Sequence, residues 1–509
     1  MTYHVYSGER KVPLQEVALN GAKVAAGMVS LGVGDGDSFA TVTRNDIPML
    51  ETMIAGNLIG AYAVPVNWHA TGEEAGYMLT DSNAKVIVVH ADLLPGIASH
   101  MPPGVPVIVI ATPPEIAAAY GIPPELCTVP EGALEWEAWR DGFAPWAEEP
   151  PLQRGSMIYT SGTTGNPKGV RREPTSADRQ ARIGELAMRA FGIGVGGVCA
   201  MTGPMYHSAP NAYARLAMTL GNDLHLLPRF EPEELLAAIA AQKLSHMHVV
   251  PTMFVRMLRL PEEVKAKYDM SSLVHVIHGA APCPPDAKKV MIEWWGPVIF
   301  EYYGSTEAGI VTIANSADAM ARPGTVGRPL DGTLVRIYDD DGNVVSEGES
   351  GEIYMSLNDL SDFTYHNKHD KRLEIERDGM VTNGDVGYQD GDGYLFLNDR
   401  KRDMIISGGV NIYPAEIEAA LHGMPGVQDC AVFGIPHDEF GESVAAALEL
   451  QPGAEVSADA VKEYLRAHIS AYKVPREVTF HAAMPREDTG KIFKRKLRQP
   501  YWERAGRQI

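Results

Sequence analysis

Residues Tyr159 to Gly169 read YTSGTTGNPKG and follow directly on the apolar pair Met157-Ile158. This stretch combines three glycines, four serine or threonine hydroxyls and one lysine. Glycines let backbone N–H groups approach phosphate oxygens, hydroxyls add hydrogen-bond donors, and the lysine adds a mobile positive charge. The composition predicts a phosphate-binding loop, for which a flexible surface loop is the alternative. The candidate contacts are Thr160, Ser161, Gly162, Thr163, Thr164, Gly165 and Lys168.

The best-known phosphate loop, that of P-loop kinases and ATPases, does not fit this stretch. Its GxxxxGK[ST] motif needs a glycine directly before the lysine and a hydroxyl directly after it. Here Pro167 precedes Lys168 and Gly169 follows it. The stretch is therefore not a P-loop of this kind.

The segments on both sides of the loop alternate between helical and strand-like patterns. The spacing of Val17 and Val24 is helical, and short apolar runs lie at 39–43, 85–89 and 274–278. Such alternation is typical of parallel strands joined by crossover helices. A proline-rich stretch at 102–151 instead predicts surface loops with short helices.

From Gly324 to Leu397 the apolar period changes to two, which indicates a smaller antiparallel unit. A charged run at 399–403 follows, and beyond it lies a short α+β pattern. We therefore expect an α/β protein with a large N-terminal domain of parallel α/β subdomains plus a small β-barrel-like unit, and a small α+β C-terminal domain. The expected boundaries are 1–398 for the first domain, 399–403 for a hinge linker and 404–509 for the second.

Composition excludes several classes of function. The 509 residues carry a formal charge of −21, so phosphate backbones are repelled and nucleic-acid binding is not expected. The four cysteines have no zinc spacing and fit a reduced, cytoplasmic protein. Neither a signal-peptide pattern nor an apolar run of membrane-spanning length is present, so stable membrane insertion is not expected. A homodimeric state stays open.

The loop closely resembles the phosphate-loop signature of the adenylate-forming superfamily. This family comprises acyl- and aryl-CoA synthetases, firefly luciferase and the adenylation domains of peptide synthetases. Six further motifs follow in the family's order, so the resemblance covers nearly the whole chain. They are Gly279 to Pro282, Tyr302 to Glu307, Gly324 to Gly327, Thr382 to Asp385, Asp399 to Gly409, and Pro485 to Lys491.

The resemblance implies a site for ATP and Mg²⁺. Tyr303 is expected to stack on adenine, Thr306 to donate to a phosphate oxygen, and Glu307 to hold Mg²⁺ as a hard oxygen ligand. Asp385 and Arg400 are implied to contact the ribose. The remaining nucleotide contacts implied by the motifs are Gly279, Ala280, Ala281, Gly304 and Ser305.

Lys491 is implied to be the catalytic lysine of the family, with Thr306 and Glu307 as the other catalytic residues. A carboxylate must approach a polyanionic phosphate, and one ammonium that bridges both offsets their repulsion. No general base is needed, because a carboxylic acid is already ionised at pH 7. The basic tail after Lys491 is expected to be a solvated helix.

The acyl pocket is expected around 207–214, 250–254, 279–281 and 308–311. A lone histidine is usually structural, but His207 lies where the family places an aromatic segment at the acyl pocket. The expected lining is His207, Ser208, Val250, Phe254, Gly279, Gly304, Ala308 and Gly309. Because this lining is apolar with several small residues, we expect an uncharged aliphatic, alicyclic or aromatic acid.

The second half-reaction is expected to transfer the acyl group to coenzyme A, as in bacterial acyl-CoA synthetases of fatty acid metabolism. The resemblance implies that the C-terminal domain rotates about Arg402 between the half-reactions. It also implies a coenzyme A tunnel at Ser407, Gly408 and Gly409, with Lys473 and Arg476 near the coenzyme's phosphate. An amide ligase of the same fold, which passes the acyl group to an amine, shares every adenylation motif and remains the alternative.

Overall fold

The computed structural model describes residues 2–160, 166–400, 403–407, 410–486 and 492–505. Its N-terminal part contains a parallel sheet with the strand order β4-β3-β5-β6-β7. The strands are β3 (Ser38–Val42), β4 (Tyr62–Pro65), β5 (Ala84–His90), β6 (Val107–Ile110) and β7 (Leu134–Glu135). Residues of β3 and β4 are buried throughout, as expected for parallel strands with both faces covered.

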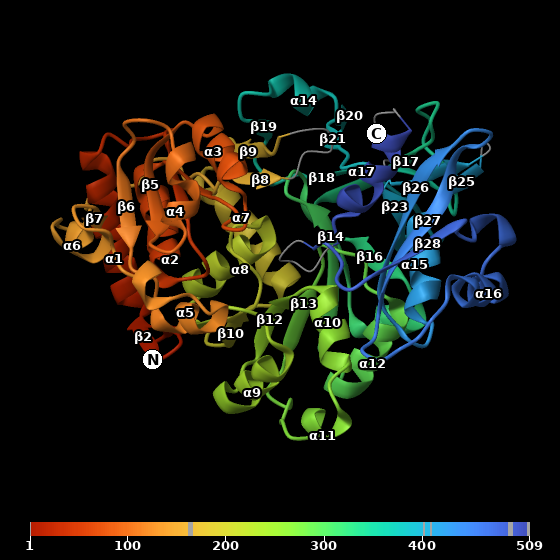
Figure 1. Cartoon of the computed structure of the whole chain (residues 1–509). Coiled ribbons are helices and arrows are strands. Elements are labelled where there is room, and N and C mark those ends of the chain that lie inside the picture. The colour runs from red at the N-terminus through yellow and green to blue at the C-terminus, as the bar shows by residue number, and fades with distance from the viewer. Residues whose placement is uncertain (1, 161–165, 401–402, 408–409, 487–491, 506–509) are drawn as a thin grey trace.

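Helices pack on this sheet (Figure 1) and include α1 (Leu14–Ser30), α2 (Ile47–Ile59), α3 (Gly72–Asp81) and α6 (Trp136–Asp141). The predicted alternation is confirmed for this part. The proline-rich stretch contains more than loops, because β7 extends the sheet and Trp136 is fully buried against it.

The second sheet has the order β2-β1-β11-β10-β12-β13-β14, and in Figure 1 it runs from β2 beside the N-terminus to β14 near the middle of the molecule. Its strands are β1 (His4–Ser7), β2 (Arg10–Pro13), β10 (Val198–Met201), β11 (Asp223–Leu226), β12 (His246–Val249), β13 (His275–His278) and β14 (Ile299–Ser305). Strand β1 lies parallel to β11, so the N-terminus joins the second sheet and not the first.

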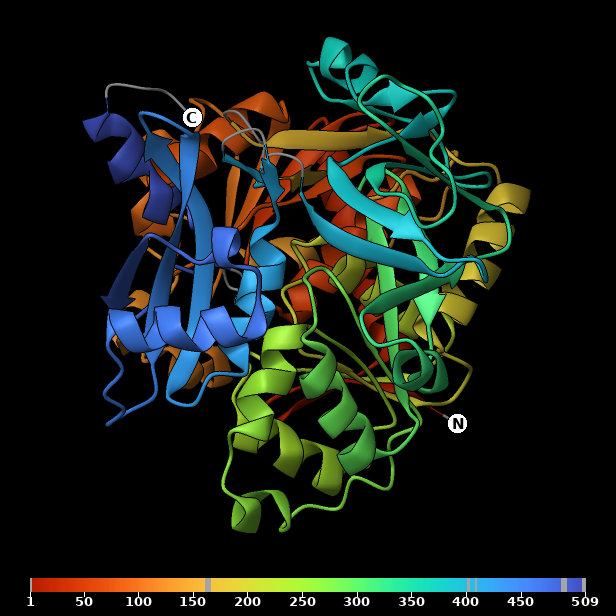
Figure 2. The ribbon, with the colours of Figure 1, turned by 90° about the vertical axis from the view of Figure 1, so that its right-hand side faces the viewer.

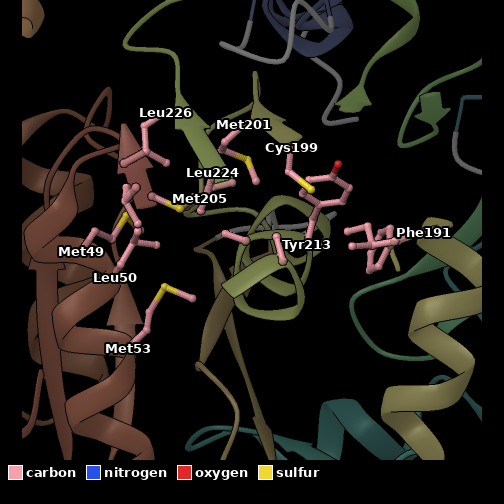
Figure 3. Close-up of a cluster of buried hydrophobic side chains, with 14 of the residues drawn as sticks. Met49, Leu50, Met53, Phe191, Cys199, Met201, Met205, Tyr213, Leu224 and Leu226 are labelled. Atoms are coloured by element: carbon pink, nitrogen blue, oxygen red, sulfur yellow. The ribbon is translucent and has the colours of Figure 1, made fainter. Parts of the chain in front are cut away.

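The helices that precede or connect the strands of the second sheet include α7 (Ala177–Phe191), α8 (Ser208–Thr219), α10 (Pro251–Leu258) and α12 (Pro285–Trp295). Figure 3 shows the core between it and the first subdomain, in which Tyr213 of α8 points toward Cys199 while Met53 of α2 faces the same cluster. Burial of this apolar surface joins the two subdomains into one N-terminal domain.

The antiparallel unit grows directly from the second sheet. Its strands include β15 (Gly309–Ala314), β16 (Thr325–Pro329), β17 (Thr333–Tyr338), β18 (Gly351–Leu357), β22 (Asp385–Gln389) and β23 (Leu395–Arg400). Strand β15 pairs with β14 and β16, and β16 pairs with β23. The period-two prediction is therefore confirmed, and β23 continues through the first two residues of the expected linker.

A small antiparallel sheet completes the N-terminal part. It has the order β19-β9-β8, formed by β19 (Phe363–Tyr365), β9 (Lys168–Arg172) and β8 (Ile158–Thr160). Strands β8 and β9 flank the phosphate loop, since Thr160 and Lys168 are register partners.

The C-terminal part is an α+β unit, seen in front in Figure 2. It contains β24 (Ile405–Ser407), β25 (Val410–Ile412), β26 (Val427–His437), β27 (Gly441–Leu450), β28 (Glu477–His481), α15 (Pro414–His422), α16 (Ala458–His468) and α17 (Lys494–Arg504). Arg259, just after α10, donates to the backbone carbonyl of Gln428 at the start of β26 and so links the two parts. Among the described residues, no helix combines the length and apolar character that crossing a bilayer requires.

Candidate active site

A cavity of about 1990 Å³ lies where the N-terminal sheets and the C-terminal part meet. Its lining includes the end of β14, the β8–β9 hairpin, one side of α8 and much of α7. The C-terminal part contributes Arg486, Phe493 and Lys496. Ligands of α/β proteins bind at the carboxyl ends of strands, which is the position of the β14 residues here.

The aromatic ring of Tyr365 lies between the side chains of Lys168 and Glu307, two residues predicted to contact phosphate and Mg²⁺. The ammonium of Lys168 lies 4.8 Å from the centre of this ring, and the Tyr365 hydroxyl donates to Oε1 of Glu307 over 2.9 Å. Burial lowers the pKa of Lys168, although the Glu307 carboxylate opposes that effect. Burial and the same carboxylate raise the pKa of Tyr365, so the hydroxyl remains a donor. One cation and one carboxylate therefore face the cavity around a single ring.

Arg172 holds the backbone of the β14 motif from behind. Its guanidinium donates to the carbonyl oxygens of Thr306 (2.6 Å), Glu307 (2.7 Å) and Ser361 (2.8 Å). Burial lowers the pKa of Arg172 to about 10, so it stays charged at neutral pH. Arg172 was not predicted from the sequence. The period of a strand could have indicated it, because residues 168, 170 and 172 lie on the same face of β9. All three line the cavity.

Tyr303 and Asp385 form a buried polar pair beside the cavity. The Tyr303 hydroxyl and the Asn383 side-chain amide each donate to Oδ2 of Asp385 over 2.8 Å. Both residues of the pair are buried, and the cavity surface nearby is formed by Asn383 and Gly384. Asp385 is the register partner of Arg400 in the β22–β23 ladder, so the backbone brings the two residues implied in ribose contact together.

Two residues of the expected acyl pocket, His207 and Ser208, lie at the N-terminus of α8 and line the cavity. His207 is the residue before the helix, and Oγ of Ser208 lies 3.0 Å from Oγ1 of Thr306. His248 and Tyr302, which the sequence analysis did not propose, form part of the same surface, with His248 Nε2 3.1 Å from the Tyr302 hydroxyl. Burial lowers the pKa of His248 to about 4, so its ring is neutral.

The two glycine-containing motifs supply close backbone approaches. A Cβ at Gly279 would collide with the Tyr302 ring, and one at Gly304 would collide with the carbonyl of Gly309. Ala280 has a φ of 68°, in the left-handed region that residues other than glycine rarely adopt. Ala280, Ala281, Gly304, Ser305 and Gly309 all line the cavity.

Not every expected pocket residue reaches the cavity. Val250, the residue before α10, lines the cavity. Phe254 lies one turn further along α10 and points away from the cavity, edge-on to Trp295. Ala308 packs into the core of the antiparallel unit. Gly279 lies behind Tyr302, outside the lining residues. The cavity therefore takes His207, Ser208, Val250, Gly304 and Gly309 from the expected set.

Three of the expected coenzyme A residues are described, namely Ser407, Lys473 and Arg476, and they lie in the C-terminal part outside the cavity lining. Lys473 is paired with Glu416 over 2.5 Å, and Arg476 contacts Nε2 of His437 over 2.6 Å. Ser407 ends β24 opposite Gly441. Several predictions fall outside the described residues, namely those for Ser161, Gly162, Thr163, Thr164, Gly165, Arg402, Gly408, Gly409 and Lys491, together with the side chain of Arg400.

Comparison with known proteins gives consistent matches. Residues 2–360 match the family described as AMP-binding enzyme, and residues 416–491 match its C-terminal domain. A long-chain-fatty-acid–CoA ligase, FadD13 of Mycobacterium tuberculosis, is 31% identical over 479 residues, which cover 93% of this chain and 90% of the ligase. A feruloyl-CoA synthase of an Amycolatopsis species is 32% identical over 510 residues, covering 98% and 95%.

A solved structure also superimposes on the whole chain. The amide bond synthetase McbA from Marinactinospora thermotolerans matches with a TM-score of 0.84 at 24% identity, covering 98% of this chain and 96% of McbA. At that identity the likeness concerns the fold alone. It confirms the predicted architecture of a large N-terminal and a small C-terminal domain.

Proposed function

The chain belongs to the AMP-binding, adenylate-forming enzyme family, and from this premise we propose that it joins a carboxylic acid to coenzyme A through an acyl-adenylate. In the first half-reaction a carboxylate oxygen bonds to the α-phosphorus of ATP, the bond to the bridging oxygen breaks, and pyrophosphate leaves. In the second, the thiol sulfur attacks the acyl carbon, its proton is released, and AMP leaves.

The observation that carries the proposal is the arrangement of Lys168, Tyr365 and Glu307. The Lys168 ammonium lies over the Tyr365 ring, and the Glu307 carboxylate accepts a hydrogen bond from the Tyr365 hydroxyl. Thr306 lines the same cavity. In the proposed site Lys168 and Thr306 orient the phosphates, while Tyr303 orients Asp385 toward the ribose. Positioning and charge stabilisation are the main needs of such a reaction, since the attacking carboxylate needs no base.

The donor set also fits a magnesium ion. Oε1 of Glu307 accepts the Tyr365 hydroxyl, which fixes the orientation of the carboxylate toward the cavity. Carboxylate oxygens are ligands that Mg²⁺ prefers. Glu307 would hold the ion, which when bound would neutralise charge on the ATP phosphates.

Lys491 completes the proposal as the residue that bridges carboxylate and α-phosphate. Support comes from the sequence, because the match to the family's C-terminal domain extends to residue 491. The described residues Arg486 and Phe493 on either side of it line the cavity. An ammonium placed between two anions lowers the repulsion that they meet on approach.

The choice of coenzyme A over an amine rests on two relatives more than 30% identical, which are named as a long-chain-fatty-acid–CoA ligase and a feruloyl-CoA synthase. We propose that Arg402 is the pivot and that Ser407, Gly408 and Gly409 line the path of the thiol, with Lys473 and Arg476 near the coenzyme's phosphate. Transfer to an amine remains the alternative acceptor reaction.

The test is made in two stages with the purified full chain. Carboxylic acids should drive Mg²⁺-dependent exchange of pyrophosphate into ATP without coenzyme A, and release of ADP and phosphate would contradict adenylation. Coenzyme A and amines are then offered separately, and products are identified by mass spectrometry. Formation of an acyl-CoA supports the proposed acceptor, whereas formation of an amide alone overturns it.

A further inference from the structure

Helix α8 presents two different faces. Tyr213, Ala214 and Ala217 point into the core and are fully buried. The opposite face carries Ser208 and Arg215, which are half-buried, and Ala212 and Thr219, which are exposed; the four residues follow one another at helical spacing and all line the cavity. A single stripe of α8 thus runs along the cavity from the Thr306 contact of Ser208 to Thr219.

Arg215 stands on this stripe as an isolated cation. Among the described residues its guanidinium makes no hydrogen bond, ion pair or ring contact, whereas Arg154, Arg172 and Arg486 in the same lining each have carboxylate or carbonyl partners. Burial alone lowers the pKa of Arg215, and no neighbouring charge contributes. Glu185 of α7 also lines the cavity, but it is exposed and does not affect this pKa.

Apolar side chains flank Arg215 along α8. Leu216 and Met218 lie on either side of the stripe that carries Arg215, and both also line the cavity. A guanidinium that is withdrawn from bulk water without a partner is costly, and arginine is retained in such places mainly to bind carboxylate or phosphate groups. The place therefore offers an apolar channel with one anion-binding group in it.

We propose that Arg215 binds a second carboxylate at the distal end of the acid substrate, so that the enzyme's preferred substrates are dicarboxylic acids of medium length. This inference rests on the proposed adenylation and replaces the expectation of an uncharged acid. Ser208 and Arg215 are seven residues apart on one face, a separation of roughly 10 Å along the helix axis. Helical side chains generally lean toward the N-terminus of their helix, so a guanidinium at position 215 can reach a carboxylate closer to Ser208 than this separation.

The test compares matched pairs of acids in the pyrophosphate exchange assay. Adipate, pimelate and suberate are measured against hexanoate, heptanoate and octanoate with the wild-type chain, Arg215→Met and Arg215→Lys. In Arg215→Met the ratio of kcat/KM for diacid over monoacid should fall about 10- to 100-fold, as expected for one charged hydrogen bond to a carboxylate. The change should lie mainly in KM for the diacid. Arg215→Lys should keep part of the preference.

Arg189→Met is the matched control, because Arg189 lies on the neighbouring helix α7, is mostly exposed, pairs with Asp331 and does not line the cavity. It should leave the ratio unchanged. Binding of suberate alone, followed by thermal shift, should stabilise the wild type and not Arg215→Met. If monoacids drive exchange as well as diacids and Arg215→Met does not change the ratio, the inference is wrong while adenylation stands. If no acid of either kind drives exchange, the proposed function itself fails.

Discussion

Replacing Arg172 with methionine should impair adenylation far more than it changes the fold. The guanidinium makes two hydrogen bonds, of 2.6 and 2.7 Å, to the carbonyls of Thr306 and Glu307. Each hydrogen bond from a charged donor contributes about 1.5–3 kcal/mol, so the two correspond to about 3–6 kcal/mol of positioning energy. Water from the cavity can satisfy the carbonyls in the variant, and we expect about 2–3 kcal/mol to be lost, which is roughly 30- to 150-fold in kcat/KM.

Arg171→Met is the matched control for this experiment. Arg171 precedes Arg172 on β9 but points to the other side, where it lies over the Tyr62 ring and donates to the carbonyl of Gly36. Pyrophosphate exchange at varied ATP and acid, with circular dichroism to confirm folding, gives the readout. Arg171→Met should remain within about threefold of wild type, a change below 1 kcal/mol. A folded Arg172→Met variant with wild-type exchange would refute the role of Arg172 in holding the motif.

Three further predictions concern Tyr303, Lys491 and two buried histidines. Tyr303→Phe removes one hydrogen bond to Asp385 and should raise KM for ATP about 3- to 10-fold without changing KM for the acid, and an unchanged KM for ATP would speak against the ribose assignment. Lys491→Ala should lose adenylation by roughly 10²–10⁴-fold yet still transfer the acyl group from a supplied acyl-adenylate, and failure at that transfer would show a different role. Burial lowers the pKa of His248 and of His275 from 6.5 to about 4, so the unfolded chain binds more protons than the folded chain between these pH values. Thermal stability should therefore fall as the pH drops from about 6.5 to about 4. A His248→Gln variant whose stability depends on pH as strongly as that of the wild type would contradict this.

Local patterns of the sequence predicted most of the fold. The alternating strands and helices of the N-terminal part and the period-two strands after Gly324 all have their expected types. Long-range pairing was less accessible. The hairpin formed by β1 and β2 carries no local signal that it joins a strand more than 200 residues later in the chain. The two-residue strand β7 is too short for any period to be visible.

The same distinction applies to the candidate site. Thr306, Glu307 and Lys168 were found because a motif marks them, and they do meet in the cavity. The prediction that Phe254 lines the acyl pocket was wrong. It rested on the apolar character of the segment 250–254 and did not consider the helical turn of α10, which points Phe254 toward Trp295. Arg215 was missed because a charged residue in an amphipathic helix has the pattern of a surface residue. Only tertiary packing shows that its face of α8 is turned toward the cavity and not toward bulk water.

The pairing of β22 with β23 has a consequence for how product and intermediate are retained. The ladder joins Asp385 to Arg400, so the backbone is tied to the N-terminal domain up to residue 400. If the C-terminal part turns between the half-reactions, the chain can swivel only beyond that point. Asp385 and Arg400, the two residues implied in ribose contact, would then both remain on the domain that does not rotate. The nucleotide part of the intermediate would stay bound during both half-reactions. The acyl-adenylate, a reactive mixed anhydride, would thus remain bound while the residues around its acyl carbon change, and it would not be released into solvent.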